Sequence, residues 1–193
     1  GGNKYFEKGQ YKQARLMYLN AIKVDPRFGE AYYKLGKIED AKYSYKKYLD
    51  LSGNSCYAEI RYAGFLFLSK DYAGAQSMVQ QIRQHCGAAN ILPIRISAYS
   101  QYELKEYQKA LTEIEQLFSL VPEDRRNAKD YEYYGKTLIA LNKDSLGINM
   151  LRSAIALDPN RGDLVSDLGA AYMKIKDYPA AIQTFTKKLA DGR

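Results

Sequence analysis

The sequence predicts an all-α chain made of helix–turn–helix units that stack in line. The clearest unit spans residues 128–161. Its first half repeats apolar or small residues at helical spacing between Tyr131 and Leu138, which indicates one buried helix face. A polar turn then leads into a second helical stretch around Leu151. The unit ends before Pro159, because proline disfavours helical backbone in the residue that precedes it.

The same pattern recurs along the chain. A small residue stands early in each expected second helix, and an apolar or aromatic residue follows four positions later. The small residues are Ala14, Ala41, Ala75, Ala110, Gly147 and Ala181. Neighbouring members of this set are 27, 34, 35, 37 and 34 residues apart. A nearly constant period of this length indicates stacked structural repeats.

A helix–turn–helix unit of 34 residues with these small and aromatic positions resembles the tetratricopeptide repeat (TPR). The resemblance covers nearly the whole chain, and the closing proline of the family matches Pro26, Pro122 and Pro159. It implies a right-handed α-solenoid of about six repeats, the first and last incomplete and the second interrupted, that forms one domain over 1–193. The expected repeats span 1–28, 29–55, 56–90, 91–127, 128–161 and 162–193.

Within these repeats the start and stop signals place the individual elements. In order, we expect a helix over 13–24 ended by Asp25–Pro26, a break at 52–55, helices over 56–70 and 73–85, a repeat over 91–122, a polar connector over 123–127, and a last repeat that starts near Gly162 and turns at 176–179.

The second repeat is short. Five residues separate Gly36 from Ala41, where the family pattern puts about twelve. Either the repeat carries a genuine deletion that fuses its two helices, or about seven or more residues are missing from the sequence after Ile38. The stretch 37–40 has no Gly, Pro or Asn that would reverse the chain, which favours the second explanation.

Composition limits the class of protein. Of the 193 residues, 46% are hydrophobic and 26% charged, which excludes a disordered chain. The net charge is +7, but Lys and Arg are mixed with 22 acids and form no run longer than two. This pattern is typical of solvated helix faces and makes nucleic acid an improbable partner. No 18-residue apolar stretch exists, so we expect no membrane span, and no signal peptide is visible.

Signals for an enzyme are poor. The sequence has one histidine, His85, and lacks the GxxxxGKS/T phosphate loop, the GxSxG elbow and the HExxH metal motif. His85 is expected at the end of a helix, where a cation is favoured by the helix dipole. We therefore expect no catalytic residues, no cofactor and no metal.

The two cysteines leave two alternatives open. Cys56 opens the first helix of the third repeat and Cys86 closes the second, so antiparallel packing brings both ends together. A disulfide would stabilise the chain by roughly 3–4 kcal/mol and would indicate an oxidising compartment, with an exported or periplasmic protein. The alternative is two unrelated buried thiols in a cytoplasmic protein.

The TPR resemblance also implies a concave binding groove lined by the first helix of each repeat. Carried across residue by residue, the main groove positions are Tyr33, Lys37, Tyr57, Arg61, Arg95, Tyr99, Tyr102, Tyr133 and Lys136. Further positions are Lys34, Ile60, Phe67, Glu103, Lys129, Ile139, Asp163, Asp167, Met173 and Lys174. Tyrosine and arginine often anchor interfaces. Alternatively, some of these tyrosines pack between repeats and some lysines are only solvated.

The sequence therefore predicts a non-catalytic scaffold that binds a peptide or a partner helix, acidic or aromatic in character, in a basic, Tyr-rich groove. The alternative is a sensory or docking region of a larger signalling or envelope-assembly protein. Tyr5 stands where a first helix should be more than half complete, so the sequence is expected to begin inside a repeat. The short, Tyr- and Lys-rich repeats resemble those of bacterial TPR proteins.

Overall fold

The structure, a computed structural model, describes residues 2–8, 10–24, 41–53, 55–87 and 90–191. The short stretch of the second repeat between Gly36 and Ala41 and the groove positions Tyr33, Lys34 and Lys37 lie outside these residues, whereas the second half of that repeat is described from Ala41 onward. The described residues form α-helices, one short 3-10 helix and connecting turns, and they contain no strand. The all-α prediction is therefore confirmed.

From Ala41 to Asp191 only a few residues separate one element from the next. The elements are α1 (Gly2–Glu7), α2 (Tyr11–Val24), α4 (Ala41–Leu51), α5 (Cys56–Leu68), α6 (Tyr72–His85), α7 (Leu92–Glu103), α8 (Tyr107–Leu120), the 3-10 helix η1 (Glu123–Arg125), α9 (Ala128–Ala140), α10 (Asp144–Leu157), α11 (Gly162–Lys174) and α12 (Tyr178–Asp191).

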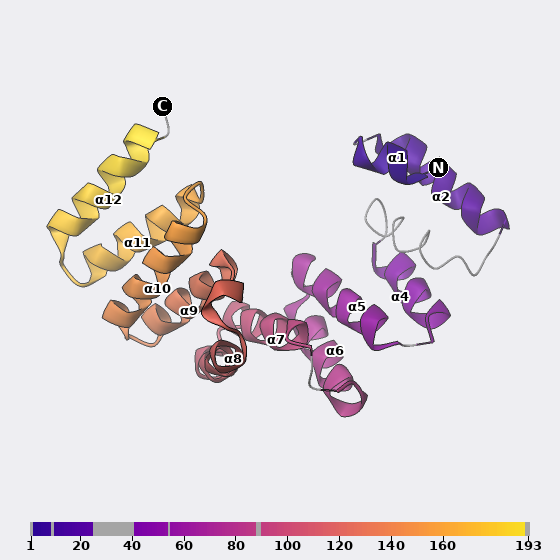
Figure 1. Cartoon of the computed structure of the whole chain (residues 1–193), viewed down its shortest axis with the longest axis horizontal. Coiled ribbons are helices and arrows are strands. Elements are labelled where there is room, and N and C mark those ends of the chain that lie inside the picture. The colour runs from indigo at the N-terminus through magenta and orange to yellow at the C-terminus, as the bar shows by residue number, and fades with distance from the viewer. Residues whose placement is uncertain (1, 9, 25–40, 54, 88–89, 192–193) are drawn as a thin grey trace.

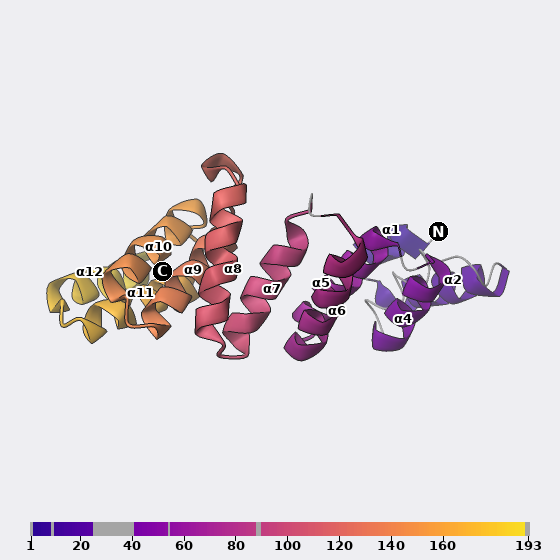
Figure 2. The same cartoon turned by 90° about the horizontal axis from the view of Figure 1, so that it is seen from below.

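Helices α4 to α12 stand in chain order along an arc (Figure 1), and the perpendicular view shows the same order (Figure 2). Each helix packs against its neighbours in the chain, and the tightest packing joins α5 to α6, α7 to α8, α9 to α10 and α11 to α12. In addition, α5 contacts α7, and α7 contacts α9. The first helices of successive pairs therefore form a continuous row. This arrangement is an α-solenoid.

Each of the four C-terminal helix pairs turns through the same backbone motif. The residue after the first helix's C-cap has a positive φ, between 60° and 64°, at Lys70, Lys105, Asn142 and Lys176. In each turn the following amide bonds a carbonyl five residues back, as from Asp71 N to Leu66 O at 2.9 Å. These bonds define a Schellman motif, which satisfies the last carbonyls of the first helix.

The core is distributed along the row of helices, as stacking requires. One cluster joins Ile60 of α5 and Val79 of α6 to Ile96 of the next pair. A later cluster joins Leu151 of α10 to Leu168 of α11. Each apolar face is therefore buried partly by its own partner helix and partly by the next repeat. None of the helices in the described ranges combines the length and apolar character that a membrane span needs.

The backbones of α9 and α10 approach each other closely. A Cβ atom on Gly147 would stand 2.7 Å from the backbone oxygen of Gly135 and 2.5 Å from a side-chain carbon of Ile139. A Cβ on Gly135 would meet the backbone oxygen of Gly147 at 2.9 Å. Glycine is needed at both positions because the backbones touch and cannot give way.

We predict that Gly147→Ala lowers the free energy of unfolding by about 1–3 kcal/mol, the usual cost of overpacking a tight site. Gly64→Ala in α5 is the matched control, since its nearest neighbour would be 3.9 Å away. That variant should gain about 0.5–1 kcal/mol from helix propensity. Urea unfolding followed by circular dichroism measures both; equal stability of the two variants would contradict the close approach.

Candidate functional site

An aromatic cluster joins the first helices of three repeats. The rings of Tyr99 in α7 and Tyr133 in α9 stack with their centroids 4.2 Å apart. Phe67 of α5 packs at an angle against both, at 6.0 and 6.4 Å. Tyr99 and Tyr133 are only 5% and 6% exposed. These two tyrosines therefore lie between repeats, as in the alternative that the sequence left open.

A fully buried carboxylate, Asp130, organises the polar side of this cluster. Arg95 donates to both of its oxygens, from Nε at 2.8 Å and Nη2 at 2.7 Å. The Tyr99 hydroxyl donates to the same carboxylate, and Asp130 also completes a capping box with Asn127. Burial, followed by the charge of Asp130, raises the pKa of Tyr99 far above its usual value. The phenol therefore stays protonated and donates.

Arg95 is thus committed to joining repeats rather than exposed to a ligand. Its side chain is 15% exposed, and its carboxylate partner comes from the next repeat. The Tyr133 hydroxyl is likewise bound, donating to Glu103 Oε1 at 2.7 Å. Burial, and then this hydrogen bond, raises the pKa of Tyr133.

Two other predicted groove residues lie at the start of α5 and remain open to solvent on at least one side. Tyr57 is 65% exposed. Arg61 is half-buried and donates from Nη1 to the Tyr57 hydroxyl at 2.7 Å, with its guanidinium 5.3 Å from the centre of that ring.

Further along the row, residues of α7, α9, α10 and α11 line a shallow, open hollow of about 390 Å³. It is lined by Tyr102, Lys136, Ile139, Ala140, Leu151, Asp167, Ala170, Ala171 and Lys174. The TPR resemblance assigned five of these residues to the groove, namely Tyr102, Lys136, Ile139, Asp167 and Lys174. Tyr102 is half-buried and packs edge-on against Tyr133, with ring centroids 5.4 Å apart.

The charges around this hollow are paired. Lys136 Nζ lies 2.8 Å from Glu132 and 3.0 Å from Asp167. Burial acts to lower the pKa of Lys136, but hydrogen bonds to the two carboxylates outweigh it and raise the pKa. Lys174 Nζ lies 2.7 Å from Asp144. The sequence predicted a basic groove, but at this place the lysines are paired with acids and lie beside apolar side chains.

The sequence analysis did not identify the acids that pair with Arg95 and Arg161, namely Asp130 and Glu132. Asp130 lies 35 residues after Arg95, and Arg161 lies 29 residues after Glu132, to which it donates at 3.0 Å. Both separations are close to one repeat. Opposite charges one period apart, on helices that stack, were the available signal for these pairs.

In the α5–α6 hairpin, Cys56 and Cys86 are joined by a disulfide, with their Cα atoms 5.7 Å apart. The bond ties the first residue of α5 to the C-cap of α6. Beside it, His85 Nε2 lies 2.8 Å from Glu59 Oε2, whose side chain is 7% exposed.

Two sequence families match the chain. The "TPR repeat" family matches residues 2–39, and the "Tetratricopeptide repeat" family matches residues 27–55. Together with the helical solenoid, these matches decide the family. The chain is a tetratricopeptide repeat protein. No curated protein matches it.

Solved structures resemble this TPR protein over most of its length. The C-terminal part of a TPR repeat-containing protein from Cytophaga hutchinsonii is 32% identical, with a TM-score of 0.61, and the match covers 67% of this chain and 50% of that one. This TPR protein thus spans half of that chain.

Two further structures show the fold alone. PilW, described as a type IV pilus biogenesis factor, is 14% identical with a TM-score of 0.81, over 98% of this chain and 89% of its own. YrrB, described as a TPR protein with an unusual peptide-binding site, is 16% identical with a TM-score of 0.61. The match covers 90% of this chain and 91% of the YrrB chain. The TPR fold generally serves as a non-catalytic scaffold for protein–protein interaction.

We predict that Asp130→Asn lowers the free energy of unfolding by about 3 kcal/mol, because it leaves the guanidinium of Arg95 buried without a counter-charge. Glu113→Gln is the control: it breaks the Arg83–Glu113 pair, whose arginine is 43% exposed. That change should cost less than about 1 kcal/mol. Urea denaturation compares them, and equal losses would show that Asp130 is not the organising charge.

Proposed function

We propose that this TPR protein binds an extended peptide segment of a partner protein along the row of first helices, and seats one large apolar or aromatic side chain of that segment in the hollow between α7, α9 and α11. The observation that carries the proposal is the hollow itself. Five groove positions from three successive repeats converge on it.

The size and lining of the hollow support this kind of ligand. A volume of about 390 Å³ is at the small end of ligand sites, which suits a side chain rather than a large cofactor. Its lining includes apolar side chains that solvent can reach, namely those of Ile139, Ala140 and Ala170. An apolar side chain placed there would move from water to a hydrocarbon surface, which stabilises the complex by about 25 cal/mol for each Å² of apolar surface buried.

The rim supports an extended peptide. Lys136 and Lys174 present amino groups, and Asp167 presents a carboxylate, on the lining of the same hollow. Donors and acceptors around an apolar pocket match the alternating carbonyl and amide groups of an extended backbone. Because the cations are already paired with acids, we infer that the apolar anchor, rather than an acidic residue, supplies most of the selectivity.

Rigidity of the surrounding helices also favours binding. The Tyr99–Tyr133 stack and the Asp130–Arg95 pair join α7 to α9, two of the helices that line the hollow. A surface that is already ordered loses little conformational entropy when a ligand arrives. The solved relative YrrB, described as having an unusual peptide-binding site, provides a precedent on the same fold.

The second candidate function is a docking region within a larger signalling or envelope-assembly protein. It is favoured by one observation, namely that this TPR protein spans only half of the Cytophaga hutchinsonii chain that it matches. Both candidates use the same hollow, and they differ in whether the peptide comes from another protein or from another part of the same one.

The test fills the hollow. Ala170 is exposed and lines it, so Ala170→Leu should occupy the space without disturbing the core. A fluorescent peptide, selected from a displayed random library on the wild-type protein, is titrated by polarisation. We expect Ala170→Leu to weaken binding at least about tenfold, since excluding one apolar anchor forfeits about 1.5–3 kcal/mol.

Ala156→Leu is the matched control, because Ala156 is an exposed helical alanine of α10 outside the lining. Its affinity should equal that of the wild type. If the library yields no peptide, or if both leucine variants bind as the wild type does, peptide binding in the hollow is wrong. Variants of Arg95 are unsuitable for this purpose, because they would break the bond between repeats.

A further inference from the structure

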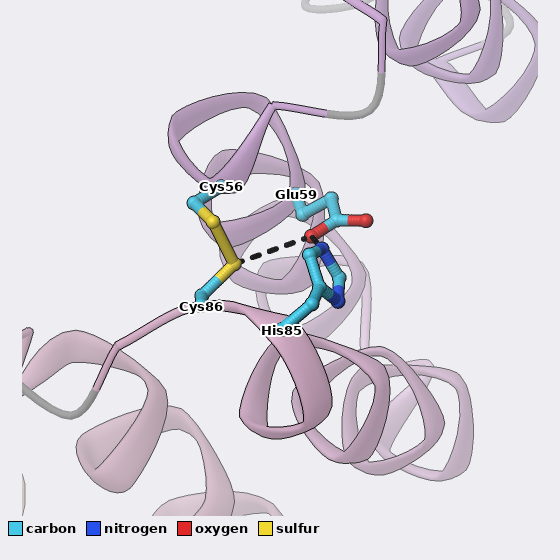
Figure 3. A group of neighbouring side chains, drawn as sticks. All are labelled: Cys56, Glu59, His85 and Cys86. Atoms are coloured by element: carbon cyan, nitrogen blue, oxygen red, sulfur yellow. Dashed lines mark hydrogen bonds and ion pairs between the residues drawn. A yellow bond between two sulfur atoms is a disulfide. The ribbon is translucent and has the colours of Figure 1, made fainter.

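Four side chains with metal-binding chemistry converge where hairpin α5–α6 closes (Figure 3). Cys56 and Glu59 come from the first turn of α5, and His85 and Cys86 from the end of α6. One ligand atom from each residue lies within 4.8 Å of all the others. The sequence predicted that Cys56 and Cys86 come together, but it did not indicate that Glu59 and His85 lie beside them.

The disulfide does not account for all of this arrangement. Glu59 is 6% exposed, and its Oε2 lies 3.6 Å from Cys86 Sγ as well as 2.8 Å from His85 Nε2. A disulfide sulfur carries no proton, so it cannot donate to that carboxylate. The Glu59 carboxylate thus faces the His85 imidazole, with which it pairs, and the Cys86 sulfur together; oxygen, nitrogen and sulfur of these kinds are all ligands that zinc takes.

We propose that, when the Cys56–Cys86 bond is reduced, the two thiolates, His85 Nε2 and Glu59 Oε2 bind one Zn²⁺ ion. Cysteine sulfur, histidine nitrogen and carboxylate oxygen are the ligands that zinc takes in proteins, and four of them form a closed, structural site. This inference does not depend on the proposed peptide function, since the hollow is built from α7 to α11.

The spacing of the ligand atoms fits a tetrahedral ion. With Zn–S near 2.3 Å and Zn–O near 2.0 Å, a tetrahedral sulfur and oxygen lie about 3.5 Å apart, against the 3.6 Å between Cys86 Sγ and Glu59 Oε2. The imidazole nitrogen and that oxygen should separate to roughly 3.3 Å. His85 can move by this amount, because its side chain is 49% exposed. Breaking the S–S bond frees the sulfurs to reach the roughly 3.8 Å of two zinc thiolates.

The chemistry balances with a thiol reductant. Two molecules of a small thiol reduce the disulfide to two cysteine thiols and are themselves oxidised to a disulfide. Zinc binding then releases the two thiol protons, because the ligands must be thiolates. Oxidation by a disulfide reverses the sequence, re-forms the Cys56–Cys86 bond and expels the metal. The hairpin is therefore closed by a covalent bond in one state and by an ion in the other.

Cobalt titration tests the proposal, because Co²⁺ in a tetrahedral thiolate site absorbs strongly in the visible and near-ultraviolet. The chain is reduced with a phosphine, freed of reductant without oxygen, and titrated with Co²⁺ and then Zn²⁺. We expect one Co²⁺ per chain, a tetrahedral spectrum with thiolate charge transfer, and displacement by Zn²⁺. The oxidised chain should give no such spectrum.

Variants separate the site from adventitious thiol binding. His85→Ala should still form the disulfide when it is oxidised. In the reduced chain it should weaken zinc binding by more than about tenfold, because losing even a residue that only supports a ligand costs about that much affinity. Gln84→Ala, its exposed neighbour, is the control and should bind as the wild type does. Helical circular dichroism verifies that both variants fold.

Glu59→Gln should weaken zinc binding in the same way, whereas Glu123→Gln on the exposed η1 segment should not. If the reduced wild type shows no tetrahedral spectrum, or if His85→Ala and Glu59→Gln bind zinc as tightly as their controls, the metal site is wrong and the cysteines serve only as a disulfide.

Discussion

The helical hairpin, closed by a left-handed residue at its turn, is the constraint on which the rest of this TPR protein depends. The Schellman bonds at Lys70, Lys105, Asn142 and Lys176 return each second helix alongside its first. Antiparallel packing then fixes which ends meet. It places the start of α5 beside the end of α6, where the cysteines lie, and it leaves the first helices in a continuous row, where the hollow forms.

Stacking the hairpins requires a second kind of interaction, since apolar contacts alone do not fix how one repeat is rotated against the next. Asp130 and Glu132 supply it, because each buried carboxylate binds a cation from outside its own helix pair. Arg95 of α7 binds Asp130, and Arg161, the N-cap of α11, binds Glu132. Buried charges are tolerated only when they are paired and hydrogen-bonded. We infer that these pairs hold the groove positions in register.

The positions of the helices could be predicted from the repeating apolar pattern of the sequence. The turn conformations and the ion pairs between repeats could not. Helices expected over 56–70 and 73–85 are found at Cys56–Leu68 and Tyr72–His85, because apolar spacing reports which face is buried. The left-handed turn residues were not foreseen, since three of the four are lysines, which do not favour positive φ. The position map of the family placed Arg95 in the groove because it contains no information about Asp130, one repeat away.

The proposed thiol site and two of the predicted groove positions lie together on α5. Tyr57 follows Cys56 directly, and Arg61 lies one turn later, so both stand on the segment that the hairpin closure holds. A disulfide and a zinc ion would tie the same two helix ends, and both keep the Cα atoms of Cys56 and Cys86 near one another. On this reasoning a change in redox conditions exchanges one closure for the other while the solenoid, and the surface that it presents to a partner, keeps its shape.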